Sequence, residues 1–364
     1  MCIKGSEILK RVRRSDASQK IRHQIEFRTL RGLAWLIPRL PRRVILIAAR
    51  RLGSLAMLVD RRGRHLGLSN LRSAIRHGDL DLGDRSPEQV LRACYQNFAR
   101  GWLDLFWFTR LSAKSMAHWI EIENEDEIRS CLRSDCGAIF ITPHYGMFEW
   151  CSLAIGFRGV KLNIVAQDFA NSSLTTVFRR AREHSGHCVI SREGAMLKLL
   201  RAVRRGEHVA MLPDLNIRPQ GAATSVRMFG TPACLTAIHV EIAKRCGAPM
   251  FLAVCEPLPD GRARLRVLDV VRVGRDADQE EISRATQAVW DLFEKNIRIS
   301  PELWMWMYKH WRFQLNSSAG DYATPPANAG DDRGAASDPE SFVADIPLVG
   351  PAASHISCRL ERSA

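Results

Sequence analysis

The middle of the chain alternates between two patterns of hydrophobic and polar positions. Short apolar runs rich in β-branched residues are separated by longer stretches in which apolar residues recur at helical spacing. The expected strands are 120–123, 138–142, 161–166, 187–190, 209–212, 249–255 and 262–273. The expected helices are 86–107, 124–134, 171–184, 195–204, 235–245 and 280–297, with a further helix after Gly146. We therefore predict an α/β fold with a largely parallel central sheet flanked by helices.

Four details of this pattern carry separate expectations. Residues 262–273 alternate apolar and charged positions, as an edge strand does, and residues 215–231 are expected to form a loop. Ser86 followed by Pro87 predicts the N-cap of the helix 86–107, and Asn70 is expected to begin another helix.

The two ends of the chain differ from the middle. Apolar residues recur near helical spacing over 44–59, but arginines interrupt 33–59, so no uncharged run of about 18 residues remains. This pattern predicts a membrane-associating interfacial helix, with a buried helical hairpin as the alternative. Beyond residue 317 the composition turns to Ala, Gly, Pro, Asp and Ser, which predicts disorder. We expect a basic arm and interfacial region (1–64), an α/β domain (65–316) and an acidic tail (317–364).

The net charge of +14 is concentrated at one end, because residues 1–64 contain 17 Lys and Arg against four Asp and Glu. Such a basic end indicates a polyanionic partner, either nucleic acid or an anionic membrane, or else a solvated arm. The ten cysteines are scattered singly without zinc spacing, which is typical of reduced core thiols on a cytoplasmic-facing protein. Cys131 and Cys136 lie close enough in sequence to touch, but we predict no disulfide. The first thirty residues lack the apolar core of a signal peptide.

The candidate chemistry lies in residues 138–150, which read AIFITPHYGMFEW. A buried strand ends at Pro143, His144 follows in the loop, and Glu149 falls on the first turns of the next helix. Open α/β sheets bind ligands at this edge. The carboxylate can hold one ring nitrogen of His144, which leaves the other as a base for a substrate hydroxyl. The alternative is a solvated histidine and a surface glutamate, and spacing alone favours that alternative.

Other polar positions accompany this segment. Asp214 follows the strand 209–212, and the helix 171–184 carries Arg179, Arg180 and Arg182. Tryptophans 304, 306 and 311 in the closing segment 301–312 can line an acyl path or close the core.

The segment from His144 to Glu149 resembles the H-x4-D/E motif of the lysophospholipid acyltransferase superfamily, and more narrowly that of the lauroyl and myristoyl acyltransferases of lipid A biosynthesis. Four further segments resemble that family in the same order, namely 178–186 (R-x-x-x-G), 212–214 (LPD), 229–232 (FGTP) and the tryptophan-rich segment 301–312. Two departures stand out. Met228 replaces a phenylalanine of the family pattern, and residues 215–217 replace glycines.

The resemblance implies a glycerolipid acyltransferase-like fold and an O-acyltransferase. The enzyme would move a fatty acyl chain from acyl carrier protein, or from acyl-CoA, to a hydroxyl of a lipid A precursor or related glycolipid, with no cofactor or metal. By this resemblance His144 is the general base and Glu149 its orienting partner. Arg182 would meet a phosphate or the oxyanion, and Asp214, Phe229 and Gly230 would bind substrate. Acyl carrier protein and anionic membrane lipid are the implied partners, at the cytoplasmic face of a bacterial inner membrane.

Three alternatives stay open from the sequence. The acceptor can be a lysophospholipid or another glycolipid. A nucleic-acid-binding protein would use the basic arm, although that arm lacks interleaved aromatic residues. A metallohydrolase would use His144, Glu149 and Asp214, although no H-E-x-x-H motif accompanies them.

Overall fold

The structure is a computed structural model that describes residues 4–314, except 127–128, 130–136, 167 and 192–193. Most of the expected helix 124–134, both Cys131 and Cys136, and the acidic tail lie outside the described residues. Of the described cysteines, Cys94, Cys151, Cys234 and Cys255 are buried thiols, as the sequence predicts.

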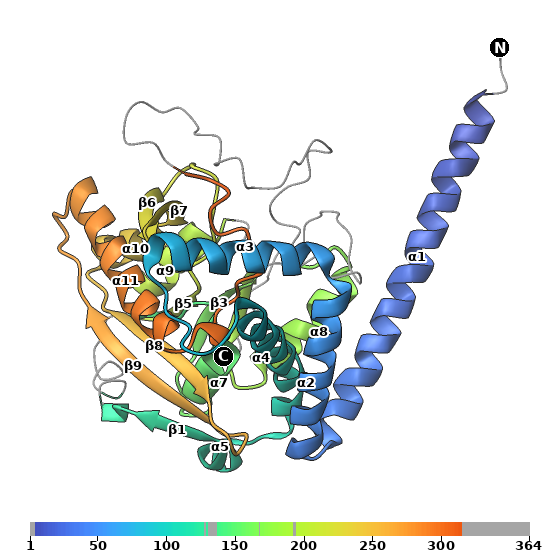
Figure 1. Cartoon of the computed structure of the whole chain (residues 1–364), viewed down its shortest axis with the longest axis horizontal. Coiled ribbons are helices and arrows are strands. Elements are labelled where there is room, and N and C mark those ends of the chain that lie inside the picture. The colour runs from blue at the N-terminus through green and yellow to red at the C-terminus, as the bar shows by residue number, and fades with distance from the viewer. Residues whose placement is uncertain (1–3, 127–128, 130–136, 167, 192–193, 315–364) are drawn as a thin grey trace, which may run out of the picture.

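A seven-stranded sheet runs through the centre of the molecule in the order β1-β9-β8-β2-β5-β3-β4 (Figure 1). Its strands are β1 (Ile120–Glu123), β2 (Ile139–Ile141), β3 (Leu162–Ala166), β4 (Cys188–Ser191), β5 (His208–Met211), β8 (Met250–Pro257) and β9 (Ala263–Val271). Every neighbouring pair is parallel except β8 with β9. The predicted α/β fold with a largely parallel sheet is therefore confirmed. The prediction that residues 262–273 form an edge strand is wrong, because β1 pairs along β9 and itself forms the edge.

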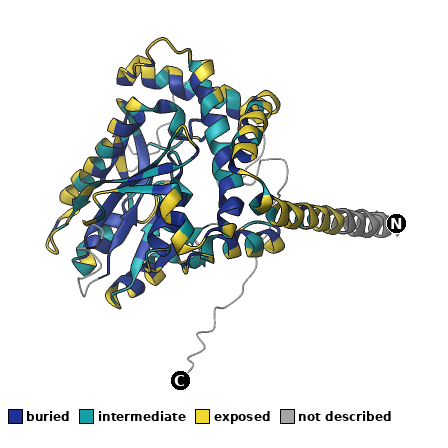
Figure 2. Ribbon diagram, turned by 90° about the horizontal axis from the view of Figure 1, so that it is seen from below, coloured by how far each residue is buried: buried dark blue, intermediate teal, exposed yellow. Residues whose placement is uncertain are grey.

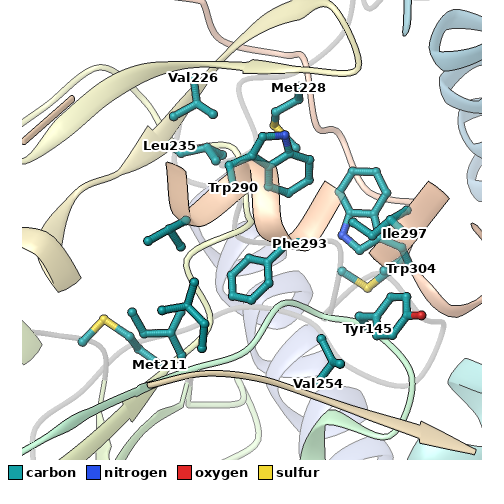
Figure 3. Packing of buried hydrophobic residues seen from close by; sticks show 14 of the residues in the cluster. Tyr145, Met211, Val226, Met228, Leu235, Val254, Trp290, Phe293, Ile297 and Trp304 are labelled. Carbon is teal, nitrogen blue, oxygen red and sulfur yellow. The ribbon is translucent and has the colours of Figure 1, made fainter. Parts of the chain in front are cut away.

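Helices cover both faces of the sheet. They are α1 (Lys4–Leu36), α2 (Arg42–Val59), α3 (Arg61–Gly78), α4 (Pro87–Trp107), α5 (Ala113–Trp119), α7 (Phe148–Gly156), α8 (Ser172–Glu183), α9 (Ala195–Arg204), α10 (Ile238–Cys246) and α11 (Gln279–Ile299), with short 3₁₀ turns at Ile37–Arg39, Phe108–Arg110 and Pro301–Leu303. The alternation of side chains along β2 separates two cores. Ile139 and Ile141 join the core built with α9, α10 and α11, of which Figure 3 shows a part. Phe140 points into the second core, with α7 and α8.

A hairpin forms where the sequence pattern predicts a loop. β6 (Ala223–Met228) and β7 (Thr231–Thr236) pair antiparallel, and α10 accordingly begins at Ile238 instead of 235. The turn between them has two successive residues with positive φ, Phe229 at 45° and Gly230 at 73°, as a two-residue hairpin of the I′ kind requires. A Cβ at Gly230 would lie 2.1 Å from the carbonyl oxygen of His77, so the turn packs directly on the end of α3.

The helices before the sheet differ from expectation at one point. α3 begins at Arg61 instead of Asn70, because the Asp60 side chain caps it by accepting the Gly63 N–H at 2.8 Å. Asn70 lies inside that helix and donates from Nδ2 to the carbonyls of Trp306 and Tyr308, each at 2.8 Å. The predicted start of α4 is confirmed, since Ser86 forms a capping box with Gln89.

The predicted helix at 44–59 is confirmed as α2. Among the residues that the structure describes, no helix is both long and apolar enough to cross a bilayer.

Candidate active site

His144 and Asp214 meet at the carboxyl edge of the central sheet. The Nδ1 atom of His144 lies 2.7 Å from Asp214 Oδ1, and the backbone N–H of His144 donates to Asp214 Oδ2 at 2.9 Å. The aspartate side chain has no exposed surface, whereas the imidazole keeps 20% of its surface exposed. One side of the histidine is therefore fixed by the protein while another faces outward.

The sheet explains why two residues so far apart in sequence are neighbours. β2 and β5 pair in parallel, with Ile141 opposite Met211. Each strand then leads into a proline, Pro143 or Pro213, and the next residue is His144 or Asp214. A proline ends the ladder at the same level in both strands because it has no N–H to donate. The two side chains therefore leave the sheet side by side.

The electrostatics of the pair define the tautomer of the histidine. Burial disfavours the charged aspartate, but the charge and hydrogen bonds of His144 and the Trp304 indole outweigh burial and hold the Asp214 pKa below its ordinary value. An ionised carboxylate only accepts hydrogen bonds, so Nδ1 of His144 carries the proton. In the neutral imidazole the lone pair then lies on Nε2, which has no hydrogen-bond partner among the described residues.

The segment after α11 contacts both Asp214 and the loop that carries His144. The Trp304 indole N–H donates to Asp214 Oδ2 at 3.0 Å. Its ring stacks on His310, with ring centroids 3.9 Å apart. The backbone of the His144 loop pairs with the same segment, because the Gly146 N–H donates to the Leu303 carbonyl at 2.7 Å. Trp304 therefore both anchors the loop and holds the carboxylate, a role that the sequence does not reveal.

Glu149 does not bind His144, so the predicted hydrogen bond between them is wrong. Arg182 of α8 binds the Glu149 carboxylate instead. Its Nη2 and Nε atoms donate to Glu149 Oε1 at 2.6 and 3.1 Å. Glu149 lies on the first turn of α7, where its side chain turns toward α8, while the Phe148 ring lies 5.2 Å from the His144 ring. Asp214 takes the place that the sequence assigned to Glu149.

The contacts that Arg182 and Asp214 make within the protein limit which of their atoms are left for a substrate. Burial disfavours the charged guanidinium of Arg182, yet Glu149 outweighs this and raises the Arg182 pKa. Nε and Nη2 are engaged, and Nη1 makes no hydrogen bond with any described residue. Asp214 is fully buried against His144 and Trp304, and its predicted part in substrate binding stays a prediction. Arg179 lies on the same helix, with Nη2 4.0 Å from Asp168 Oδ1.

Phe229 lies among aromatic side chains, and its predicted contact with substrate stays a prediction. Its ring is fully buried and packs against the rings of Trp304 and Trp306, at 5.8 and 5.3 Å between centroids. Phe229 therefore supports the segment that holds Asp214. Gly230 is exposed, and its predicted contact with substrate stays a prediction.

Other donors near the site do not form a ligand cluster. Among the described residues, no group of three or more His, Cys, Asp or Glu side chains is placed to hold a metal ion. A signal for the His144–Asp214 pair is present in the sequence, because a strand, a proline and a polar residue occur in that order twice.

Comparison with known proteins places this geometry in context. The model of the family described as "Bacterial lipid A biosynthesis acyltransferase" matches residues 15–313. The lipid A biosynthesis lauroyltransferase of Escherichia coli is 22% identical over 291 residues, covering 77% of this chain and 89% of that protein. The phosphatidylinositol mannoside acyltransferase of Mycolicibacterium smegmatis is 22% identical over 234 residues, covering 63% of this chain and 75% of that protein. A solved structure of the 1-acyl-sn-glycerophosphate acyltransferase of Thermotoga maritima aligns with a TM-score of 0.34 and 10% identity, over 72% of this chain and 99% of that chain.

Proposed function

The chain belongs to the bacterial lipid A biosynthesis acyltransferase family, and from that premise we propose that it transfers a fatty acyl chain from a thioester donor to a hydroxyl of a lipid A precursor or related glycolipid, with His144 as the general base. Membership of the family makes the protein an O-acyltransferase with a lipid acceptor. The donor, the acceptor and the base are the proposed parts. The observation that supports the base is the 2.7 Å contact between His144 and Asp214 at the sheet edge.

The proposed chemistry needs only two contributions from the protein. His144 Nε2 takes the proton of the acceptor hydroxyl as its oxygen attacks the thioester carbonyl, and Asp214 stabilises the imidazolium that forms. The thiolate of the donor then leaves and takes up that proton. A positioned base of this kind contributes about 10²–10⁴-fold to the rate. No acyl-enzyme is needed because the acceptor hydroxyl is itself the nucleophile.

The ion pair of Glu149 and Arg182 joins α8 to the first turn of the helix that follows His144, and it suits an anionic substrate. Glu149 fixes the guanidinium through Nε and Nη2, and Nη1 is left to meet a phosphate or the developing oxyanion. Glu149 therefore acts on the reaction through Arg182. The side chains of both residues are largely buried, at 14% and 18% exposure, which strengthens the interaction of Arg182 with an anion.

Acyl carrier protein is the proposed donor, with acyl-CoA as the alternative; both present the acyl chain on phosphopantetheine. For the acceptor, a mannosylated phosphatidylinositol is the second candidate, because three of the matched relatives carry the name phosphatidylinositol mannoside acyltransferase. A lysophospholipid is the third.

The test compares His144→Ala with His65→Ala, which removes an exposed imidazole from α3. Each full-length protein is given acyl carrier protein or CoA thioesters and each of the three acceptors, and products are weighed by mass spectrometry. We expect the wild type and His65→Ala to add one acyl group to the glycolipid, and His144→Ala to be about 10²–10⁴-fold slower. Wild-type turnover by His144→Ala would overturn the assignment of the base.

A further inference from the structure

Tyr145, the residue directly after the proposed base, is tied to a carboxylate on the neighbouring strand. Its side chain has no exposed surface, and Figure 3 shows its hydroxyl pointing away from Phe293. The hydroxyl donates to Glu256 Oε1 at 3.1 Å, and the backbone carbonyl oxygen of Asn296 lies 3.4 Å from it. Burial raises the pKa of the Tyr145 phenol above its ordinary value, and the charge of Glu256 raises it further. The phenol therefore keeps its proton and acts as a donor to this carboxylate.

An ion pair of Glu256 and Arg266 holds the acceptor of that hydrogen bond. Figure 2 shows that the strands of the central sheet are mostly buried, so a charged side chain on them needs a partner. Glu256 lies near the end of β8, and Arg266 lies on β9, directly opposite Val254. Arg266 donates from Nε and Nη2 to the two oxygens of Glu256, each at 3.1 Å, and from Nη2 to Asn296 Oδ1 at 2.8 Å. A two-armed pair has a well-defined geometry, so it fixes the carboxylate that binds the Tyr145 hydroxyl.

The backbone of the same loop also contacts the end of β8. The Met147 N–H donates to the Cys255 carbonyl at 2.7 Å, and Gly146 forms a β-bridge with Cys255. Gly146 has a φ of 56°, and a Cβ there would lie 2.3 Å from the Cys255 carbonyl oxygen, so glycine is needed for this close approach. Glu256 is the next residue of β8. The backbone contact at Cys255 and the side-chain contact at Glu256 therefore hold the loop to the end of one strand.

The segments on either side of the loop are fixed without Tyr145. Before the loop, β2 pairs with both β5 and β8. After it, the indole N–H of Trp150 in α7 donates at 3.2 Å to the buried carboxylate of Asp104, which Arg42 of α2 also binds. The part of the chain whose position Tyr145 can decide is therefore the loop between them, which carries His144.

His144 and Tyr145 are held from opposite sides of β2. This strand lies between β5 and β8, and Asp214, which binds His144, follows β5, whereas Glu256, which binds Tyr145, lies on β8. Without the Tyr145 contact the loop could shift relative to Asp214, and Nε2 of His144 would no longer keep one direction. A base acts only within hydrogen-bond reach of the proton that it removes, and a misplacement of about 1 Å can cost roughly 10²-fold in rate.

We propose that Tyr145, Glu256 and Arg266 position the base. The ion pair of Glu256 and Arg266 holds the Tyr145 hydroxyl, and Tyr145 holds the loop so that His144 Nε2 stays directed at the acceptor hydroxyl. In this arrangement none of the three touches the reacting atoms, so they are positioning residues that act through His144. The inference rests on the proposed function, because Tyr145 has this role only if His144 is the base.

The central comparison is between Tyr145→Phe and Tyr95→Phe. Each variant deletes the hydroxyl of a buried tyrosine, and Tyr95 donates its own to Asp60 Oδ2 at 2.7 Å, at the start of α3. We expect kcat for acyl transfer to fall about tenfold in Tyr145→Phe while KM changes little, and to stay at the wild-type value in Tyr95→Phe. Chemical denaturation should show similar losses of stability in both variants, so a fall in kcat confined to Tyr145→Phe cannot come from stability.

The ion pair is tested with two arginines of the same strand. Arg266→Gln is compared with Arg264→Gln, which removes an arginine that pairs with Glu121. Arg266 also lines an open pocket of about 270 Å³ together with Lys295, so shortening its side chain leaves space that water can fill. We expect Arg266→Gln to lower kcat about tenfold and Arg264→Gln to leave it unchanged. Arg266→Lys should recover part of the loss, because an ammonium group can bind one oxygen of Glu256 but not both.

Proton NMR gives a readout that a purely structural role would not change. The Nδ1 proton of His144, held by Asp214, should exchange with water faster in Tyr145→Phe and in Arg266→Gln than in the wild type, because the loop that carries the ring is less restrained. In Tyr95→Phe its exchange should match the wild type. Equal kcat and equal exchange in Tyr145→Phe and Tyr95→Phe would overturn the proposal.

Failure of the positioning role and failure of the proposed function give different results. Wild-type turnover by His144→Ala would remove the base, and the positioning role would fall with it. A slow His144→Ala together with a Tyr145→Phe that turns over like the wild type would keep the base and remove only the role of Tyr145.

Discussion

The His144 edge and the outer face of α2 depart from ordinary protein structure in opposite ways. At the sheet edge a carboxylate is fully buried, and three hydrogen bonds from His144 and Trp304 satisfy it. On α2 large apolar side chains are exposed, and arginines beside them have no described acid partner. Burying a charge and exposing apolar surface each cost free energy. The first arrangement fixes the orientation of the His144 imidazole, and the second suits a partner outside the chain.

One buried group, Asp104, connects the two regions, and removing its charge should have the largest effect on stability. Asp104→Asn leaves Arg42 and Arg100 buried without a counter-charge, which costs about 3–5 kcal/mol in unfolding free energy. Chemical denaturation measures this loss. The control is Glu88→Gln, which breaks the exposed pair with Arg72 and should cost at most about 1 kcal/mol. Equal losses in the two variants would show that Arg42 and Arg100 do not need the charge of Asp104.

A smaller effect is expected when only one hydrogen bond of the sheet edge is removed. Trp304→Phe keeps a ring in the core but deletes the N–H that binds Asp214, and we expect kcat to fall about tenfold while KM changes little. Trp306→Phe is the matched control, because its equally buried indole donates to the Pro301 carbonyl instead. If both variants slowed equally, Trp304 would act through packing and not through Asp214.

The smallest expected effect is the change in the free energy of unfolding as the pH is lowered. The pKa of Asp214 is lower in the folded state, so its contribution is fully present above the ordinary aspartate value of about 3.9 and is lost as the pH falls through the folded value. Unfolding midpoints measured between neutral pH and about pH 3 should therefore fall further in the wild type than in Asp214→Asn. Parallel falls would show that Asp214 is not stabilised as an anion.

The sequence predicts where helices and strands occur better than it predicts which of them, and which side chains, contact one another. The motif strand, its proline and the helix after it are readable because apolar periodicity and chain breakers are local signals. The hairpin of β6 and β7 is missed, although Val226 and Met228 alternate with polar residues, because its turn uses Phe229 at positive φ instead of a common turn residue. Family resemblance, and not spacing, is what favours His144 over a solvated histidine.

The orienting carboxylate is missed for a different reason. Glu149 is near His144 in sequence, whereas Asp214 is near it only because β5 lies beside β2, and the order of strands in a sheet is not a local property. The arginine that pairs with Glu149 is not predicted either, because the chain contains many arginines and nothing in the sequence indicates that Arg182 is the partner. The apolar positions of α2 are predicted, but which of them face outward depends on the packing of Gly53 against α4.

The most direct test of whether Asp214 holds the His144 ring is proton NMR of the ring N–H groups of the histidines. A proton on Nδ1 of His144, held by Asp214, should give a downfield resonance that is protected from exchange. We predict that this resonance is present in the wild type and in Glu149→Gln, and that it is absent from His144→Ala and Asp214→Asn. A resonance that survives in Asp214→Asn but disappears in Glu149→Gln would contradict the account.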